Sequence, residues 1–202
     1  MTKGTLFIIS APSGAGKTSL VAEILKRVAN IKASVSHTTR ACRPGEQDGV
    51  NYYFVSLALF QKMVKHADFL EHAEVFGNYY GTSEQWVRDT LACGTDVILE
   101  IDWQGAKQTR QQFPSSKSIF ILPPSLQALE ARLNNRGQDN SNVINQRVAA
   151  AKDEMSHYAE ADYLMVNDDF QLALSHLEKI ILGQIDQNSV MVDEDLINNL
   201  LA

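Results

Sequence analysis

The chain has 202 residues, 45% of them hydrophobic and 21% charged, with a formal net charge of -6 at pH 7. This composition excludes a largely disordered chain, and the length suits one α/β domain with small inserted lobes. The acidic balance argues against broad binding to nucleic acid or to an anionic membrane. No apolar run approaches the ~18 residues that span a bilayer. The two cysteines lack metal-site spacing, so we expect a soluble cytoplasmic protein without zinc or disulfides.

A phosphate-binding loop follows the first predicted strand. The apolar run 6–9 leads into Ala-Pro-Ser-Gly-Ala-Gly-Lys-Thr, and a helical pattern then continues to about Ala29. Small residues let backbone N–H groups converge on phosphate oxygens, and the positive end of the helix points at them. Alanine replaces the usual first glycine, which is tolerable if its φ is negative. The pattern predicts binding of a nucleoside triphosphate by Ala11, Pro12, Ser13, Gly14, Ala15, Gly16, Lys17 and Thr18.

Two residues of this loop have further predicted roles. Lys17 is expected to reach the β- and γ-phosphates, and the Thr18 hydroxyl is expected to ligate Mg²⁺.

The rest of the chain alternates between two kinds of segment. Residues 34–81 hold short strands and turns, which predicts a small inserted sheet lobe. From residue 83 helical patterns alternate with strands, and the predicted strands are 96–102, 118–122 and 163–166. This alternation predicts a mainly parallel sheet flanked by helices, with ligands at the carboxyl ends of the strands. A final apolar stripe at Leu196, Ile197, Leu200 and Leu201 predicts a short helix after an Asp193 cap.

Eight short motifs occur in order along the chain. They are Ser10–Lys17, Val35–Arg40, Arg43–Glu46, Gly77–Gly81, Ile101–Gly105, Ile119–Pro124, Arg136–Gly137 and Val166–Asp169. The series resembles bacterial guanylate kinase, a nucleoside monophosphate kinase with a P-loop. The resemblance implies Mg²⁺-dependent transfer of the γ-phosphoryl group of ATP to GMP, giving ADP and GDP, in purine nucleotide metabolism.

The resemblance also implies how one domain is divided. The P-loop NTPase-type core is expected over residues 1–33, 82–125 and 149–185, with a GMP-binding lobe at 34–81 and a helical lid at 126–148. The tail from residue 186 to 202 lies outside this pattern, and it is expected to pack on the core or on another subunit, which leaves a homo-oligomer open.

By position, the resemblance assigns three groups of site residues. The implied ligands of the GMP phosphate are Arg40, Arg43, Tyr52 and Tyr80, and those on the guanine side are Ser36, Glu71, Thr82 and Asp102. The implied lid arginines are Arg132, Arg136 and Arg147, and Asn167 matches the adenosine end of the ATP site. The expected catalytic residues are Lys17, Arg40, Arg43, Arg132, Arg136 and Arg147.

The chemistry of these residue types agrees with the assigned roles. The Glu71 carboxylate can accept the N1–H and N2–H₂ donors that guanine presents side by side, and Ser36 or Thr82 can donate to O6. Glu100 and Asp102 are expected on one strand face, with Glu100 supporting the magnesium through water. The family usually has aspartate at the position of Glu100.

Three alternatives stay open at the level of sequence, and one of them is a nucleotide-dependent regulator, which would bind a triphosphate without monophosphate-dependent turnover. Guanylate-kinase-like domains of scaffold proteins bind phosphopeptides without catalysis, but they typically lose the phosphate loop and the lid arginines, which this chain retains. A kinase for AMP or for a pyrimidine monophosphate is the remaining alternative, and Glu71 with Ser36 favours guanine over both.

Overall fold

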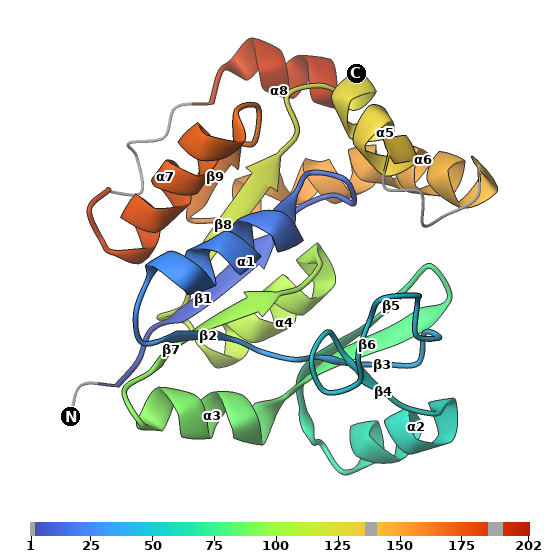
Figure 1. Cartoon of the computed structure of the whole chain (residues 1–202), viewed down its shortest axis with the longest axis vertical. Helices are drawn as coiled ribbons and strands as arrows, with labels where there is room; N and C mark the ends of the chain where they lie inside the picture. Colours follow the sequence, from blue (N-terminus) through green and yellow to red (C-terminus); the bar gives the residue numbers. More distant parts are fainter. Residues whose placement is uncertain (1–2, 136–140, 186–191) are drawn as a thin grey trace. The chain divides into compact units, whose positions relative to one another are not determined.

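The computed structural model of the chain describes residues 3–135, 141–185 and 192–202, which form two compact units. Unit 1 comprises residues 30–116 and the N-terminal residues up to Leu6, and unit 2 comprises residues 7–29 and those from Lys117 onwards. Each unit contains parallel strands and helices, labelled in Figure 1. The α/β class predicted from the sequence is confirmed.

Unit 1 contains a pair of parallel strands and a small sheet that comes between them in the sequence. The parallel strands are β2 (Ile31–Ala33) and β7 (Asp96–Glu100). The small sheet has the order β4-β3-β6-β5, and its strands are β3 (His37–Thr38), β4 (Tyr53–Phe54), β5 (Phe69–Val75) and β6 (Asn78–Ser83). A small sheet therefore lies within this part of the sequence, in one unit with residues 82–116, and β6 is a strand that the periodicity did not predict.

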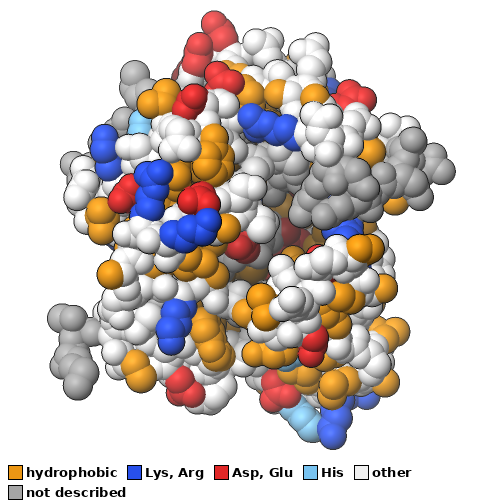
Figure 2. Space-filling view, viewed as in Figure 1, with side chains coloured by type: hydrophobic (Ala, Val, Ile, Leu, Met, Phe, Trp, Pro, Cys, Tyr) orange, Lys and Arg blue, Asp and Glu red, His pale blue; other side chains and the backbone are white. Residues whose placement is uncertain are grey.

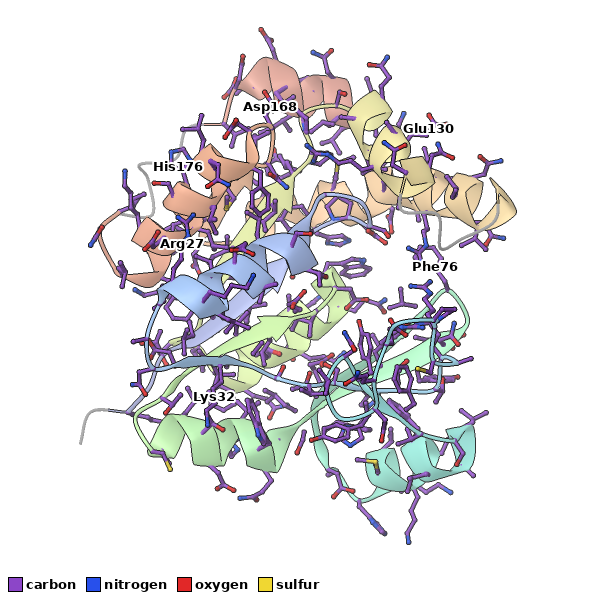
Figure 3. The ribbon with its side chains drawn as sticks, viewed as in Figure 1. Arg27, Lys32, Phe76, Glu130, Asp168 and His176 are labelled. Carbon is purple, nitrogen blue, oxygen red and sulfur yellow. The ribbon has the colours of Figure 1, made fainter. Side chains whose placement is uncertain are left out.

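The hairpin of β5 and β6 turns at two residues in the left-handed region. Phe76 has φ 49° and Gly77 has φ 73°, and Phe76 is labelled at this turn in Figure 3. The register places Glu71 opposite Thr82, so these two side chains lie on the same face of the sheet.

Side-chain caps fix where the three helices of unit 1 begin. The helices are α2 (Leu57–Lys65), α3 (Glu84–Ala92) and α4 (Trp103–Gln112). Ser56, Ser83 and Asp102 each accept a hydrogen bond from an N–H group of the following first turn, which has no partner inside the helix. On α2 the buried residue is Phe60, whereas Leu59 is 45% exposed, and apolar side chains gather over α2 and the small sheet in Figure 2.

Unit 2 is built on the parallel strands β1 (Leu6–Ser10), β8 (Lys117–Leu122) and β9 (Tyr163–Val166), with β8 paired to both others. Its helices are α1 (Lys17–Arg27), α5 (Leu126–Asn135), α6 (Ser141–Ser156), α7 (Phe170–Ile181) and α8 (Glu194–Leu201), with a 3₁₀ turn at His157–Glu160. Every residue of β1 is buried, as the continuous apolar run predicts for a parallel strand. On α1, Arg27 (Figure 3) lies 3.5 Å from the Glu178 carboxylate of α7.

The C-terminal helix α8 packs on the helices α5 and α6. Leu200 is 2% exposed and belongs to one apolar cluster with Leu129 and Leu133 of α5 and with Ile144 and Met155 of α6. Asp193 caps α8 by accepting a hydrogen bond from the Asp195 N–H group, as the sequence predicts. The apolar stripe of the tail is therefore covered by the chain itself.

None of the helices in the described ranges combines the length and the apolar character that crossing a bilayer demands.

Candidate active site

The phosphate-binding loop in unit 2 has the backbone conformation that its glycines permit. Gly14 has φ 94° and Gly16 has φ 92°, a left-handed region that residues with a Cβ adopt rarely. The positive-φ residues other than glycine in the described chain are Asn30, Ala67 and Phe76, so Ala11 has no need of glycine. The loop ends where α1 begins, and Lys17 and Thr18 therefore lie at the positive end of that helix.

Asn167, which follows β9, supports the loop from within unit 2. Its Nδ2 atom donates a buried hydrogen bond of 2.7 Å to the carbonyl of Ala15, and the residue is 4% exposed. A Cβ at Gly16 would collide with the same amide nitrogen, so glycine is required there on two counts. Arg132 of α5 donates from Nη2 to the backbone carbonyl of Asn167 over 2.9 Å. Asn167 thus links Arg132 to the loop.

Helix α6 holds Ser13 of the loop by two groups. Arg147 Nη1 donates to the Ser13 hydroxyl oxygen over 2.9 Å, and the Ser13 N–H group donates to Glu154 Oε2 over 3.2 Å. Arg147 and Glu154 lie two helical turns apart and therefore share a face of α6. Glu154 was not predicted, although its spacing from Arg147 was a signal that the sequence contained.

Three of the residues assigned to the guanine side form one polar group in and beside the small sheet of unit 1, in which Ser36 is half-buried. Glu71 is 3% exposed and Thr82 is 1% exposed, and they face each other across β5 and β6. The Ser36 and Thr82 hydroxyl oxygens lie 3.2 Å apart, with either able to donate. The structure therefore brings together three of the four residues assigned to guanine.

The fourth residue, Asp102, is not on the strand with Glu100, so that prediction is wrong. Strand β7 ends at Glu100, and Asp102 is the N-cap of α4. Its Oδ1 atom accepts the Gly105 N–H group over 2.8 Å, and its Oδ2 atom accepts from Gln104 over 3.2 Å. The cap hydrogen bond takes the chain out of the strand because it requires helical residues directly after Asp102.

The phosphate-side residues of unit 1 surround Arg40. Its Nη2 atom lies 2.7 Å from Glu46 Oε1, and its Nη1 atom donates to the Ala41 carbonyl over 2.7 Å. The guanidinium carbon lies 5.4 Å from the centre of the Tyr52 ring, which in turn lies 5.8 Å from the Tyr80 ring. Arg40, Tyr52 and Tyr80 therefore lie together in unit 1.

Glu46 connects Arg40 to Arg43. Its second carboxylate oxygen accepts the Arg43 N–H group over 2.8 Å, so one carboxylate fixes both ends of this turn. The sequence placed Glu46 in a motif but assigned it no role.

The charges of this group shift several pKa values. Burial lowers the pKa of Arg40, but hydrogen bonding to Glu46 and the charges of Tyr80 and Glu46 raise it above its ordinary value. Burial raises the pKa of Glu46, but the hydrogen bonds from Arg40 and from the Arg43 backbone bring it below its ordinary value. Burial, with added repulsion from Tyr80 and Glu100, raises the pKa of Tyr52, which therefore remains a hydroxyl donor.

The residues assigned to Mg²⁺ lie in different units. Thr18 is exposed in the first turn of α1, and a hydroxyl oxygen is a hard donor that suits Mg²⁺ beside phosphate oxygens. Glu100 is half-buried at the end of β7, and its charge acts on Tyr52. The remaining predicted residue, Arg136, lies outside the described residues.

Comparison with known proteins accounts for this combination of loop and sheet. The sequence profile described as Guanylate kinase matches residues 3–184. The chain belongs to the guanylate kinase family. A guanylate kinase of Alcanivorax borkumensis is 58% identical over 202 residues, which cover 99% of this chain and 98% of that protein. One of Saccharophagus degradans is 62% identical over 180 residues, covering 89% and 88%.

Comparison with solved structures indicates the same family. The crystal structure of guanylate kinase from Anaplasma phagocytophilum matches with a TM-score of 0.77 and 34% identity, covering 91% of this chain and 87% of that one. Members of the guanylate kinase family transfer the γ-phosphoryl group of ATP to GMP. The chain is accordingly an ATP:GMP phosphotransferase.

Proposed function

We propose that unit 1 holds GMP and that unit 2 holds ATP with Mg²⁺. The residues described above carry out the transfer of the γ-phosphoryl group from ATP to GMP. The observation that supports this division best is that the buried Glu71 and Thr82 of the small sheet lie with the half-buried Ser36, which directly precedes β3, while Arg40 follows the same strand by two residues. The Glu71 carboxylate and the two hydroxyls provide a hydrogen-bond acceptor and donors for a base, and the Arg40 guanidinium provides a cation for a phosphate.

Base selection follows from the chemistry of Glu71. An ionised carboxylate only accepts hydrogen bonds, and guanine offers N1–H and N2–H₂ as adjacent donors. Adenine offers an acceptor at N1, which cannot donate a hydrogen bond to the buried carboxylate. A site built around such bonds discriminates on the order of 10⁴-fold or more. In the same arrangement either Ser36 or Thr82 donates to O6, since one of the two hydroxyls donates to the other.

Phosphate binding falls to Arg40 and Arg43, with the hydroxyls of Tyr52 and Tyr80. Two guanidinium groups and two hydroxyl donors suit a phosphate dianion because they satisfy several oxygens at once. The Glu46 carboxylate fixes the turn that carries both arginines. The phosphate-binding arginines are therefore largely in position before GMP binds.

The transfer requires positioning and charge neutralisation rather than a general base. A phosphate oxygen of GMP is already an anion at neutral pH and attacks the γ-phosphorus directly. The bond from that phosphorus to the β–γ bridging oxygen breaks, and the oxygen leaves on ADP. Lys17, together with Arg132, Arg136 and Arg147, offsets the negative charge on the transferred phosphoryl group. In related phosphoryl transfer, one arginine in this role raises kcat by a factor of roughly 10³–10⁵.

Mg²⁺, when bound, neutralises the β- and γ-phosphate oxygens and orients them. Thr18 supplies one ligand in this proposal, and Glu100 acts through water. Asn167 acts on the ATP side through the loop that it supports. A cytoplasmic location is part of the same proposal, because both cysteines are exposed thiols that persist in a reducing compartment.

The test is ADP release by the purified chain with ATP and Mg²⁺, with GMP, AMP, UMP or CMP added separately. We expect fast release with GMP alone. Release with another monophosphate contradicts the guanine pocket, and binding without any release favours the phosphopeptide-binding alternative.

A matched pair of variants then tests the pocket itself. Glu71→Gln replaces one acceptor by a donor at the same size, and we expect a fall in kcat/KM for GMP with little change in the KM for ATP. Glu74→Gln is the control, because Glu74 is exposed on the same strand. Equal kinetics for the two variants would remove Glu71 from the site.

A further inference from the structure

A glycine occupies position 105 in the first turn of α4 although the backbone there does not require one. Its φ lies outside the left-handed region, unlike that of Gly14 or Gly16. In an ordinary helical conformation, glycine costs roughly 0.5–1 kcal/mol relative to alanine. The reason for glycine must therefore be the space beside it.

The space beside Gly105 is occupied by the Glu71 carboxylate. A Cβ at position 105 would lie 2.5 Å from Glu71 Oε2 and 3.1 Å from Glu71 Cδ. The next nearest atom, the Cβ of Ile101, lies 3.3 Å away. The closest atom is the end of a side chain and not backbone, so an added methyl group would move the carboxylate more readily than the helix.

The same face of α4 is hydrogen-bonded to the backbone on both sides of Glu71. Gln112 Nε2 donates to the Leu70 carbonyl over 2.7 Å. Gln108 donates to the His72 carbonyl over 2.9 Å and accepts the His72 N–H group over 3.2 Å. Positions 105, 108 and 112 lie on one helical stripe. The strand cannot slide along α4 without breaking these bonds, so it is the side chain of Glu71 that must yield to a methyl group.

We infer that Gly105 is a positioning residue that determines guanine specificity, because it leaves the Glu71 carboxylate the position in which both oxygens can accept from the base. This inference rests on the proposed role of Glu71 as the guanine acceptor. In this inference Gly105 acts on GMP through the position of Glu71.

The experiment is the Gly105→Ala variant assayed with GMP and with inosine monophosphate, which lacks the 2-amino group. Losing one charge-assisted hydrogen bond corresponds to a fall of roughly tenfold to a hundredfold in kcat/KM for GMP. We expect a smaller fall for inosine monophosphate, so the preference between the two narrows, while the KM for ATP stays within about twofold. Lys107→Ala is the control, since Lys107 is exposed on the same helix.

A second variant separates positioning from a general effect on folding. Glu71→Asp shortens the side chain by one methylene and withdraws the carboxylate from position 105. We expect Glu71→Asp to lower the kcat/KM for GMP less in the Gly105→Ala background than in the native background. The same should hold for the fall in the Tm. If Gly105→Ala does not fold, recovery of the fold in the double variant supports the same collision.

Two results would overturn the inference and leave the proposed function intact. One is native GMP kinetics in Gly105→Ala while Glu71→Gln is impaired, and the other is strictly additive costs in the double variant. Native kinetics in Glu71→Gln would instead remove the proposed role of Glu71 itself.

Discussion

The support of the phosphate loop by Asn167 is the contact with the clearest measurable consequence. Its Nδ2 atom donates over 2.7 Å to the Ala15 carbonyl in a buried setting. In Asn167→Ala this carbonyl loses its partner, and a buried polar group left unpaired costs about 1–3 kcal/mol. If the cost is met by the loop leaving its phosphate-binding conformation, the dissociation constant for ATP rises by a factor of roughly 5 to 150.

The measurement compares ATP with a ligand that has no base. We would determine dissociation constants for ATP and for inorganic tripolyphosphate, each with Mg²⁺, in the native chain and in Asn167→Ala. Support of the loop is common to both ligands, so both should weaken by the same factor. Asp168→Ala is the control, because Asp168 is exposed beside Asn167 and is labelled in Figure 3.

Two outcomes would refute this reasoning. Unchanged binding of both ligands would show that the loop keeps its conformation without the amide. A loss confined to ATP would show that Asn167 acts on the adenosine, the role implied by its motif.

Three further predictions address the other described contacts. Arg40→Lys should raise the KM for GMP about tenfold and leave that for ATP unchanged, because lysine cannot bond Glu46 and the Ala41 carbonyl as a planar group; steady-state kinetics checks this. The depressed pKa of Glu46 stabilises the folded chain above the ordinary value of 4.5, and this contribution is lost as the pH falls through the folded pKa. Glu46→Gln should therefore lower the Tm at pH 7, and thermal scans should show the difference shrinking as the pH falls below 4.5. Leu200→Ala should destabilise unit 2 by about 2–4 kcal/mol in urea titrations, whereas the exposed Asn199→Ala should not.

The local elements were predictable because their signals lie within a few residues. The apolar run of β1, the glycines after it and the apolar period of α1 specify the loop without any distant contact. The Asp193 cap and the stripe after it similarly specify α8. Strand β6 was missed because its six residues mix asparagine, tyrosine and glycine, and its pairing with β5 rather than its own pattern makes it a strand.

The candidate site was predictable as a set of residues but not as a network. The motifs identified Asn167 and Ser13, yet the bond from Asn167 to Ala15 joins residues separated by 152 positions. The same holds for Glu154, which reaches Ser13 from 141 positions away. Asp102 was wrongly predicted to lie in the strand because the apolar–polar alternation of the sequence continues through it. The hydrogen bond from Gly105 that makes Asp102 a helix cap is visible only in the folded chain.

The two edge strands of the small sheet in unit 1, β4 and β5, are protected from pairing with another chain in different ways. On one side β4 is only two residues long, which offers little backbone for another chain to pair with. On the other side the glutamines of α4 already bond the outward backbone groups of Leu70 and His72 on β5. The sheet proposed to hold GMP can therefore stay in contact with water without recruiting a strand from a second molecule, which protects the chain from edge-to-edge aggregation.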